Sequence, residues 1–344
     1  DNRLPHLSHS SQELLTEKEI LQIVKVSFVL SGYSLDRIDP HFQFDIKKAQ
    51  LKLKDLDTAS DCSDYLYQLG VESLGENKWS EQLIMMREEA LPFLRVNLLK
   101  AHDRSEVLKS LTDEGFQVEA VDGLSEAICL RQRKNVFQSQ AFQKGYFEMQ
   151  DYSSQHIAPL LSVESGMRVI DACAGAGGKT LHLASLMKNK GQIIALDIYE
   201  SKLKELKVRA KRGGAFNIET RVIDSSKVIK RLAQSADRLL IDVPCTGTGV
   251  LRRNPDPKWR LKASEFASLQ ETQYRILRDY SQMLKPGGRM VYATCSILPQ
   301  ENQNIVDEFL ASPVGEGFKK GQELAFKPEW GDGFYACALE KGAS

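Results

Sequence analysis

The second half of the chain alternates short apolar runs with longer helical patterns, and this alternation restricts the possible folds more than any other feature. The apolar runs lie at 168–173, 192–197, 220–224, 238–243 and 289–295, and each contains β-branched residues bounded by charge or glycine. Helical patterns fill the intervals between them. Such alternation is typical of α/β proteins with a doubly wound, mostly parallel sheet. A run at 333–341 predicts one more strand, antiparallel and at or near the sheet edge.

A smaller α+β pattern precedes these runs. Helical patterns around 63–69 and 80–90 lead into a strand-like run at 93–100, a helix at 104–115, and two strand candidates near Val118 and Ala127. We therefore predict three parts: a helical N-terminal extension over 1–60, an α+β accessory domain over 61–145, and the larger α/β domain over 146–344.

The composition excludes several classes of protein. Lys+Arg and Asp+Glu are both 46, so no global charge indicates a nucleic-acid partner, and a basic surface would have to be local. The six cysteines form no C-x-x-C pair, which argues against a zinc site and a disulfide scaffold and predicts a reducing, cytoplasmic location. No apolar run approaches the roughly 18 to 20 residues of a membrane span, and the opening segment lacks a secretion-signal pattern, so we expect no membrane contact.

Two cysteines follow apolar runs and begin polar signatures. Cys245 opens the loop C-T-G-T-G, and Cys295 opens C-S-I-L-P-Q-E-N. The carboxyl ends of neighbouring parallel strands face one crevice, so both thiols can face one substrate. A pair of thiols in a pocket indicates covalent chemistry on an electrophilic ring. The alternative is that each thiol is a small buried hydrophobic group, as free cysteine usually is.

A glycine-rich segment, D-A-C-A-G-A-G-G-K-T at 171–180, follows a predicted strand and opens a helix. Its glycines let the backbone approach a ligand and leave helix N-terminal amides free for polar groups. A phosphate loop would need Gly where Cys173 stands, and a dinucleotide fingerprint would need Gly where Thr180 stands. The segment therefore disfavours an NTPase and a dinucleotide enzyme.

Three aspartates end successive strands. Asp197 lies 22 residues after Gly175, where a carboxylate can accept both hydroxyls of a bound ribose. Asp224 is placed to meet an adenine amino group, and Asp242 ends the next strand. A single such aspartate is more often a helix cap or turn residue. Three aspartates that each end one of three successive strands predict an adenosine-containing cofactor.

Together these motifs resemble the RNA cytosine-5 methyltransferases of the Sun/Fmu and NSUN group. The resemblance rests on D-A-C-A-G-A-G-G-K-T, L-D-I-Y, D-V-P-C-T-G-T-G, A-T-C-S and the following Q-E-N, together with an entry segment that contains Gln150, Asp151 and Ser154. It covers roughly 63–341, and one departure is Ala176, where the family usually has proline. It implies a class I S-adenosylmethionine-dependent methyltransferase fold, Rossmann-like, with an accessory RNA-binding domain of RRM-like form.

The resemblance also implies which residues form the site. S-adenosyl-L-methionine would be bound by Cys173, Ala174, Gly175, Ala176, Gly177, Gly178, Lys179, Asp197, Asp224 and Asp242, without a metal. Cys295 would add to carbon 6 of cytosine as the nucleophile, and Cys245 would assist the elimination that releases the methylated base. Asp242 would face the N3 and amino edge of the ring, and Lys179 would orient the same base.

The implied substrate is RNA, of the bacterial ribosomal type, and the protein is expected to be a monomer. The target base must leave its stack, which favours single-stranded or loop RNA. Phosphate contacts are expected from Arg131, Arg133, Lys134, Lys207, Arg209, Lys211, Arg212, Arg252, Arg253 and Lys258. Pro255 and Pro257 would stiffen a wall of the site, or simply a surface loop.

Other functions stay open at this point. Transfer RNA is a possible substrate within the same family. In a DNA cytosine-5 methyltransferase Cys245 would be the nucleophile, but the E-N-V and F-x-G-x-G signatures of those enzymes are absent. A non-catalytic RNA-binding or ribosome-assembly factor could keep the same fold, and loss of one cysteine or of Asp197 would have favoured it.

Overall fold

The computed structural model describes residues 21–22, 24–25, 58–132 and 134–343. By its internal packing the chain divides into two units, Asp1–Ser60 and Asp61–Ser344. The predicted extension over 1–60 lies outside the described residues apart from 21–22, 24–25 and 58–60. The second unit contains the two sheets that the described residues form.

The larger sheet has seven strands in the order β10-β11-β9-β8-β5-β6-β7. These are β5 (Arg168–Asp171), β6 (Gln192–Asp197), β7 (Ile218–Val222), β8 (Ala236–Asp242), β9 (Leu284–Thr294), β10 (Phe318–Phe326) and β11 (Phe334–Lys341). The five strands from β5 to β9 pair in parallel, whereas β11 runs antiparallel to β9 and β10 antiparallel to β11. The predicted α/β class, with a doubly wound and mostly parallel sheet, is confirmed.

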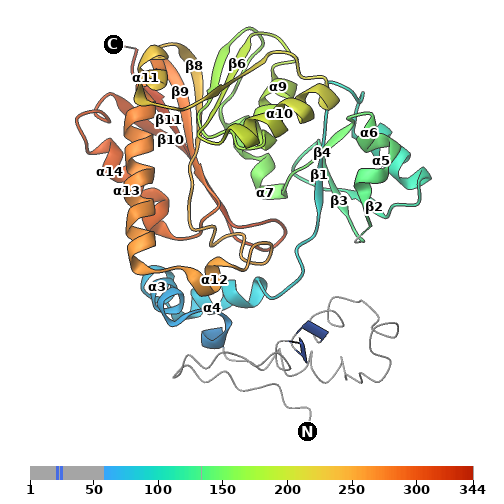
Figure 1. Cartoon of the computed structure of the whole chain (residues 1–344), viewed down its shortest axis with the longest axis horizontal. Helices are drawn as coiled ribbons and strands as arrows, with labels where there is room; N and C mark the ends of the chain where they lie inside the picture. The colour runs from blue at the N-terminus through green and yellow to red at the C-terminus, as the bar shows by residue number, and fades with distance from the viewer. Residues whose placement is uncertain (1–20, 23, 26–57, 133, 344) are drawn as a thin grey trace. The chain divides into compact units, whose positions relative to one another are not determined.

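Helices cover both faces of this sheet because its inner strands are apolar on both sides. One face packs on α8 (Ile157–Leu160), α9 (Gly178–Leu186) and α10 (Glu200–Gly213), and the other on α11 (Ser226–Arg231), α13 (Ala263–Tyr280) and α14 (Gln303–Leu310) (Figure 1). Successive strand residues alternate between the faces: Val169 joins the first core and Ile170 the second.

The helix α10 shows how the sequence specifies these layers. Its buried positions, Leu203, Leu206, Ala210 and Gly213, recur every three or four residues, so they form one stripe facing the sheet. The helix ends at Gly213, and the capping residue Gly214 has a φ of 69°, a left-handed value that suits glycine.

The smaller sheet has four antiparallel strands in the order β2-β3-β1-β4. They are β1 (Phe93–Val96), β2 (Val118–Ala120), β3 (Ala127–Leu130) and β4 (Phe147–Met149), packed with α5 (Arg104–Asp113) and α6 (Gln140–Gln143). Because β4 pairs with β1, this sheet continues past residue 145. The domain boundaries at 60 and 145 stay predictions.

Two early helices pack against the larger domain. The helices α3 (Asp64–Leu74) and α4 (Glu76–Met85) share a core with Leu251, Leu261, Phe266 and Leu298, which follow the two cysteine loops. The short α12 (Pro257–Arg260) lies beside them (Figure 1), and Ser63 donates a backbone hydrogen bond to the Lys258 carbonyl at 2.8 Å. The other short elements are η1 (Thr58–Asp61), η2 (Val136–Gln138), α7 (Tyr152–Gln155), η3 (Ser281–Met283) and η4 (Pro299–Glu301).

The strand predictions differ from the structure at several strand ends and miss two strands, β4 and β10. The predicted strand at 220–224 begins two residues earlier, at Ile218, and the one at 289–295 begins at Leu284. The strand β10 is absent from the sequence prediction because six of its nine residues are exposed at the sheet edge and its sequence has no apolar alternation. Among the helices of the described residues, none has the length and apolar content that a membrane span needs.

Candidate active site

The two cysteine loops meet at the carboxyl ends of β8 and β9. These strands are parallel neighbours, and Asp242 on β8 is in register with Ala293 on β9. Cys295 follows β9 directly and Cys245 stands three residues after β8, and their sulfur atoms lie 3.3 Å apart. Both side chains are partly exposed, so a ligand can reach them. The structure therefore brings together the two thiols that the sequence singles out.

The surroundings of Cys245 hold its thiol protonated. The hydrogen bond with Cys295 and burial raise the pKa of Cys245 well above its usual range, and the nearby Glu301 carboxylate acts in the same direction. Cys245 is therefore suited to remain a neutral thiol at physiological pH.

Lys179 and Asp242 form an ion pair beside these thiols. The Lys179 Nζ lies 2.6 Å from the Asp242 Oδ2 and 4.9 Å from the ring centroid of Phe334. Burial alone would lower the pKa of Lys179, but Asp242 and the Cys295 sulfur favour the ammonium form and raise it. The pocket therefore contains a fixed positive charge close to Cys295.

The glycine-rich segment forms an open loop between β5 and α9. Gly175 has a φ of 52° and Gly177 a φ of 89°, left-handed values that favour glycine. A Cβ at Gly177 would lie 2.5 Å from Leu206, whereas a Cβ at Gly175 or Gly178 would meet nothing within 4 Å. The loop thus packs tightly on α10 at one point and faces open space at two others.

Asp197 organises this loop from the end of β6. Its Oδ2 accepts a hydrogen bond from the Gly175 N–H at 2.8 Å, and its Oδ1 accepts one from the Tyr199 N–H at 2.8 Å. Each carboxylate oxygen keeps a second lone pair for a ligand hydroxyl. Asp224 is exposed just beyond β7, where the Ile223 N–H bonds to the Asp197 carbonyl at 2.9 Å. The structure therefore places both aspartates at the same edge of the sheet.

Asp171 is a site residue that the sequence analysis did not single out. It is buried at the end of β5, and its Oδ2 accepts the Thr180 hydroxyl at 2.7 Å. Its Oδ1 has no hydrogen-bond partner within the described part of the chain. Burial raises the pKa of Asp171 to about 7. An unpartnered carboxylate oxygen at the base of an open glycine loop fits the amino group of an amino-acid-like cofactor.

The remaining loop residues lie between Asp171 and Lys179. Cys173 is partly exposed, and burial together with the Asp171 charge raises the pKa of its thiol well above the usual range. Two buried or half-buried arginines bind the loop carbonyls: Arg95 of β1 donates to Gly178 at 2.9 Å, and Arg209 of α10 donates to Ala176 at 2.8 Å. This support comes partly from the smaller sheet and was not predicted from the sequence.

Glu301 is a second missed residue. It is fully buried, and its carboxylate accepts hydrogen bonds from the N–H of Thr246 at 2.8 Å, the hydroxyl of Thr246 at 2.5 Å and the amide of Gln273 at 2.9 Å. A further hydrogen bond joins the Thr248 and Ser296 hydroxyls at 2.9 Å. These bonds tie the loop after Cys245 to the loop after Cys295.

Several cations expected to contact phosphate are instead paired within the protein. Arg209 and Arg212 both pair with the buried Glu148, and their contact with phosphate stays a prediction. Arg252 and Arg253 pair with Asp332, Arg131 with Glu119, and Lys134 donates to the Glu114 and Gly115 carbonyls. Burial lowers the pKa of Lys258. Lys207 and Lys211 are exposed on α10, and Arg133 lies outside the described residues.

Comparison with known proteins agrees with this geometry. The fold is that of the Rossmann-like, S-adenosylmethionine-dependent methyltransferases. Residues 158–339 match the family described as 16S rRNA methyltransferase RsmB/F, and the chain belongs to this family. Residues 63–137 match the ferredoxin-like domain of RsmF/B-like methyltransferases. The resemblance to the Sun/Fmu and NSUN group is thereby confirmed.

Individual relatives are similar over most of the chain. The probable ribosomal RNA small subunit methyltransferase B of Bacillus subtilis is 36% identical over 72% of this chain and 59% of its own length. The ribosomal RNA small subunit methyltransferase B of Vibrio cholerae is 34% identical over 80% of this chain and 64% of its own length. The chain thus spans about three fifths of these relatives. The crystal structure of PH0851 is 28% identical, with a TM-score of 0.77, and covers 94% of this chain and 76% of that one.

Proposed function

We propose that this protein transfers a methyl group from S-adenosyl-L-methionine to carbon 5 of a cytosine in RNA, and that the RNA is ribosomal. The observation that carries the proposal is the pair of thiols, 3.3 Å apart, beside the Lys179–Asp242 ion pair. The names of the curated relatives support ribosomal RNA of the small subunit as the substrate class.

The site residues fit the cofactor. The open glycine loop and the unpartnered Oδ1 of Asp171 suit the methionine end, and Asp197 with Asp224 suits the ribose and adenine. When bound, S-adenosyl-L-methionine supplies an electrophilic methyl group on its sulfonium. The loop arginines Arg95 and Arg209 would keep the backbone in the shape that binds it.

The protein's own residues carry the covalent steps. Cys295, as thiolate, adds to carbon 6 of the cytosine, and the electron pair displaced from the 5,6 double bond makes carbon 5 nucleophilic. The positive charge of Lys179 stabilises that thiolate and the charge that develops on the ring. Asp242 faces the N3 and amino edge of the base. After methylation, water takes the proton from carbon 5, the electron pair of that C–H bond reforms the 5,6 double bond, and the bond between Cys295 and carbon 6 breaks to release Cys295 as a thiolate.

The position of Cys245 suits an assisting role. Its sulfur lies 3.3 Å from that of Cys295, so as a thiol it can donate a hydrogen bond to the Cys295 sulfur while that sulfur leaves carbon 6. A role restricted to RNA binding would need neither the thiol pair nor the ion pair beside it.

The test compares wild type, Cys295→Ser and Cys245→Ser with methyl-labelled cofactor and unmodified ribosomal RNA or transfer RNA. Two products are scored: 5-methylcytosine and protein–RNA adducts that resist denaturation. Wild type should form 5-methylcytosine in ribosomal RNA, Cys295→Ser should form neither product, and Cys245→Ser should accumulate the adduct. An adduct with Cys295→Ser would instead assign the nucleophile to Cys245, and methylation of transfer RNA alone would change the substrate.

A further inference from the structure

An exposed tryptophan stands in the loop between β10 and β11. Trp330 has 54% of its surface accessible. The guanidinium carbon of Arg131, the residue after β3, lies 5.8 Å from the centroid of its ring. Glu119 on β2 pairs with this guanidinium and so fixes its orientation. An indole from the larger domain and an arginine from the smaller sheet therefore form one surface.

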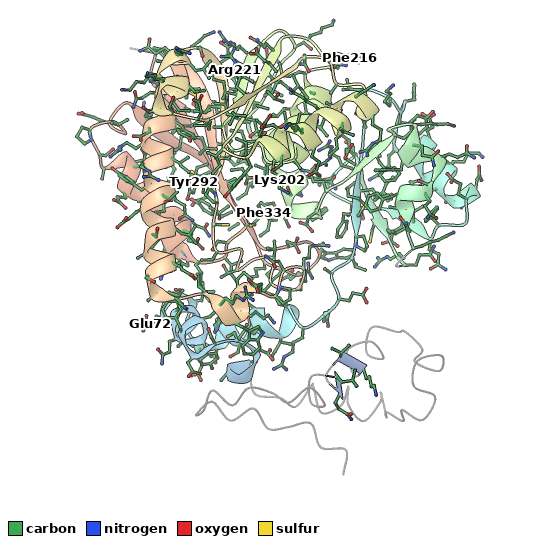
Figure 2. The ribbon with its side chains drawn as sticks, viewed as in Figure 1. Glu72, Lys202, Phe216, Arg221, Tyr292 and Phe334 are labelled. Carbon is green, nitrogen blue, oxygen red and sulfur yellow. The ribbon has the colours of Figure 1, made fainter. Side chains whose placement is uncertain are left out.

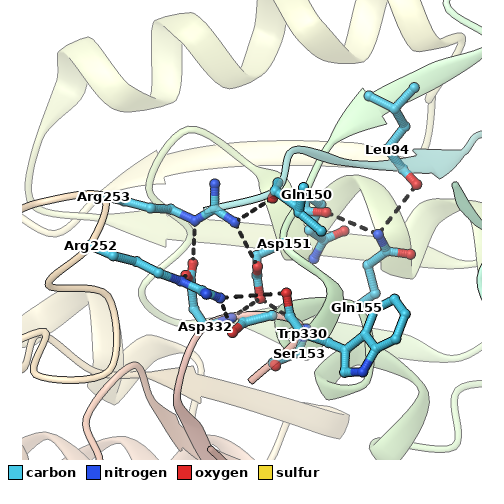
Figure 3. A network of polar contacts seen from close by, with 11 residues as sticks. Leu94, Gln150, Asp151, Ser153, Gln155, Arg252, Arg253, Trp330 and Asp332 are labelled. Carbon is cyan, nitrogen blue, oxygen red and sulfur yellow. Dashed lines mark hydrogen bonds and ion pairs between the residues drawn. The ribbon is translucent and has the colours of Figure 1, made fainter. Parts of the chain in front are cut away.

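Ion pairs attach this loop to the loop that begins at Cys245. Arg252 donates to the carbonyls of Trp330 and Gly331, and Arg252 and Arg253 both pair with the buried Asp332, at 3.3 and 2.7 Å (Figure 3). Figure 3 shows the Trp330 indole pointing away from these pairs.

A third segment completes the attachment. Asp151 accepts a hydrogen bond from the Asp332 N–H at 3.0 Å and pairs with Arg253 at 3.0 Å. The Trp330 backbone is therefore held in a fixed position relative to the thiol loop.

The segment that carries Trp330 continues through Gly333 and Phe334 into the candidate active site. Gly333 donates to the Gly249 carbonyl at 2.8 Å, and Phe334 is the ring over which Lys179 lies. Phe334 lies four positions after Trp330 in the chain, so their Cα atoms are at most ~14 Å apart along an extended chain. Trp330 is thus within reach of the nucleotides beside a cytosine bound at the thiols.

We propose that Trp330 and Arg131 form a stacking platform for an unpaired RNA base next to the target cytosine, an inference that rests on the proposed function. A cytosine that leaves its stack exposes the faces of its neighbours, and an aromatic ring can cover one of them. Every base has such a face, so the platform contributes affinity with little sequence preference. The guanidinium of Arg131 adds a cationic contact to the same stack.

Trp259 offers a matched control. It is equally exposed, at 54%, but lies on α12, and no arginine stacks on it among the contacts of the described residues. Phe216 is more exposed than either tryptophan. It follows the C-terminal end of α10, whereas Lys202 lies near the start of that helix (Figure 2).

The experiment measures the binding of fluorescein-labelled single-stranded RNAs, one rich in adenosine and one rich in uridine, each with a single cytosine. Trp330→Ala should weaken binding of the adenosine-rich RNA about tenfold and that of the uridine-rich RNA less, because adenine stacks more strongly. The dependence of affinity on salt should not change, since no phosphate contact is lost. Trp330→Phe should stay within about threefold of wild type, Arg131→Met should lose about threefold, and Trp259→Ala should lose less than twofold.

Circular dichroism spectra of the variants are compared with that of wild type to check that each variant is folded. Equal losses in Trp330→Ala and Trp259→Ala, or a wild type that does not bind these RNAs, would overturn the platform. The methylation assay separates the two proposals. If wild type binds RNA through Trp330 but forms no 5-methylcytosine, the proposed function fails and the platform stands. If wild type methylates RNA and Trp330→Ala keeps its KM for RNA, the platform fails alone.

Discussion

Both carboxylate oxygens of Glu301 bind Thr246, the residue that follows Cys245. One oxygen accepts the Thr246 N–H at 2.8 Å and the other accepts its hydroxyl at 2.5 Å. Glu301 itself stands six residues after Cys295, so this contact sets the spacing of the two thiol loops. The carboxylate is buried, and among the described residues it has no cationic partner and is satisfied by hydrogen bonds alone.

Replacing Glu301 by glutamine should loosen this contact. One oxygen becomes an NH₂ group, which cannot accept the hydrogen bond that this oxygen now receives, so we expect the free energy of unfolding to fall by about 1–3 kcal/mol. The spacing of the thiols should become less uniform, and diamide should form the Cys245–Cys295 disulfide more slowly than in wild type. Urea unfolding and the rate of thiol loss check both effects. Glu308→Gln, exposed on α14, is the control, and equal behaviour of the two variants would contradict the assignment.

The buried carboxyl of Asp171 should make stability depend on pH. Its pKa is about 7 in the folded chain against an ordinary value of 3.8, so between these values the folded state holds a proton that the unfolded state has lost. Stability should therefore fall as pH rises from about 4 to 7, by about 1.4 kcal/mol per unit. Asp171→Asn should remove this slope and be more stable than wild type above pH 7. Urea unfolding at several pH values tests it, with the exposed Asp122→Asn as control; a wild type without the slope would refute it.

Loss of the Asp197 carboxylate should weaken cofactor binding. Asp197→Ala removes the acceptor of the Gly175 N–H and the expected ribose contact, each a hydrogen bond to a charged group worth about 1.5–3 kcal/mol. We therefore expect the Kd for S-adenosyl-L-methionine, measured by calorimetry, to rise at least tenfold. Glu200→Ala, exposed at the start of α10, should leave the Kd unchanged. An unchanged Kd in Asp197→Ala would place the cofactor elsewhere.

A methyl group at Gly249 should push apart the loop after Cys245 and the segment before β11, which lie next to each other at the site. A Cβ there would lie 2.1 Å from the Gly333 carbonyl oxygen, so the thiol loop and the start of β11 would have to move apart. We expect Gly249→Ala to lose about 1–3 kcal/mol of stability and most of its methylation rate. Gly317→Ala, where a Cβ meets nothing within 4 Å, should match wild type in thermal unfolding and activity. Similar melting of the two variants would show that the close approach is dispensable.

Part of the fold is predictable because buried strands must be apolar and must end where polar loops begin. The end of β6 is predicted correctly and that of β8 within one residue, and so are the positions of Asp197 and Asp242, whereas β5 ends two residues earlier than predicted. This reasoning fails for β10, an exposed edge strand whose pattern is set by its pairing with β11 and not by burial. It also fails for β4, whose three residues are too few to show a period.

The sequence by itself determined the α/β class, the glycine loop and the meeting of Cys245 with Cys295, because all three follow from local pattern and the shared direction of parallel strands. Only the tertiary structure decided the partners of the charged and buried polar groups. Glu301 and Thr246 are 55 residues apart in the chain, and Arg252 pairs with Asp332, which lies 80 residues further on. Such partners depend on which loops the packed helices and sheets bring together, and no local pattern in the chain encodes that choice.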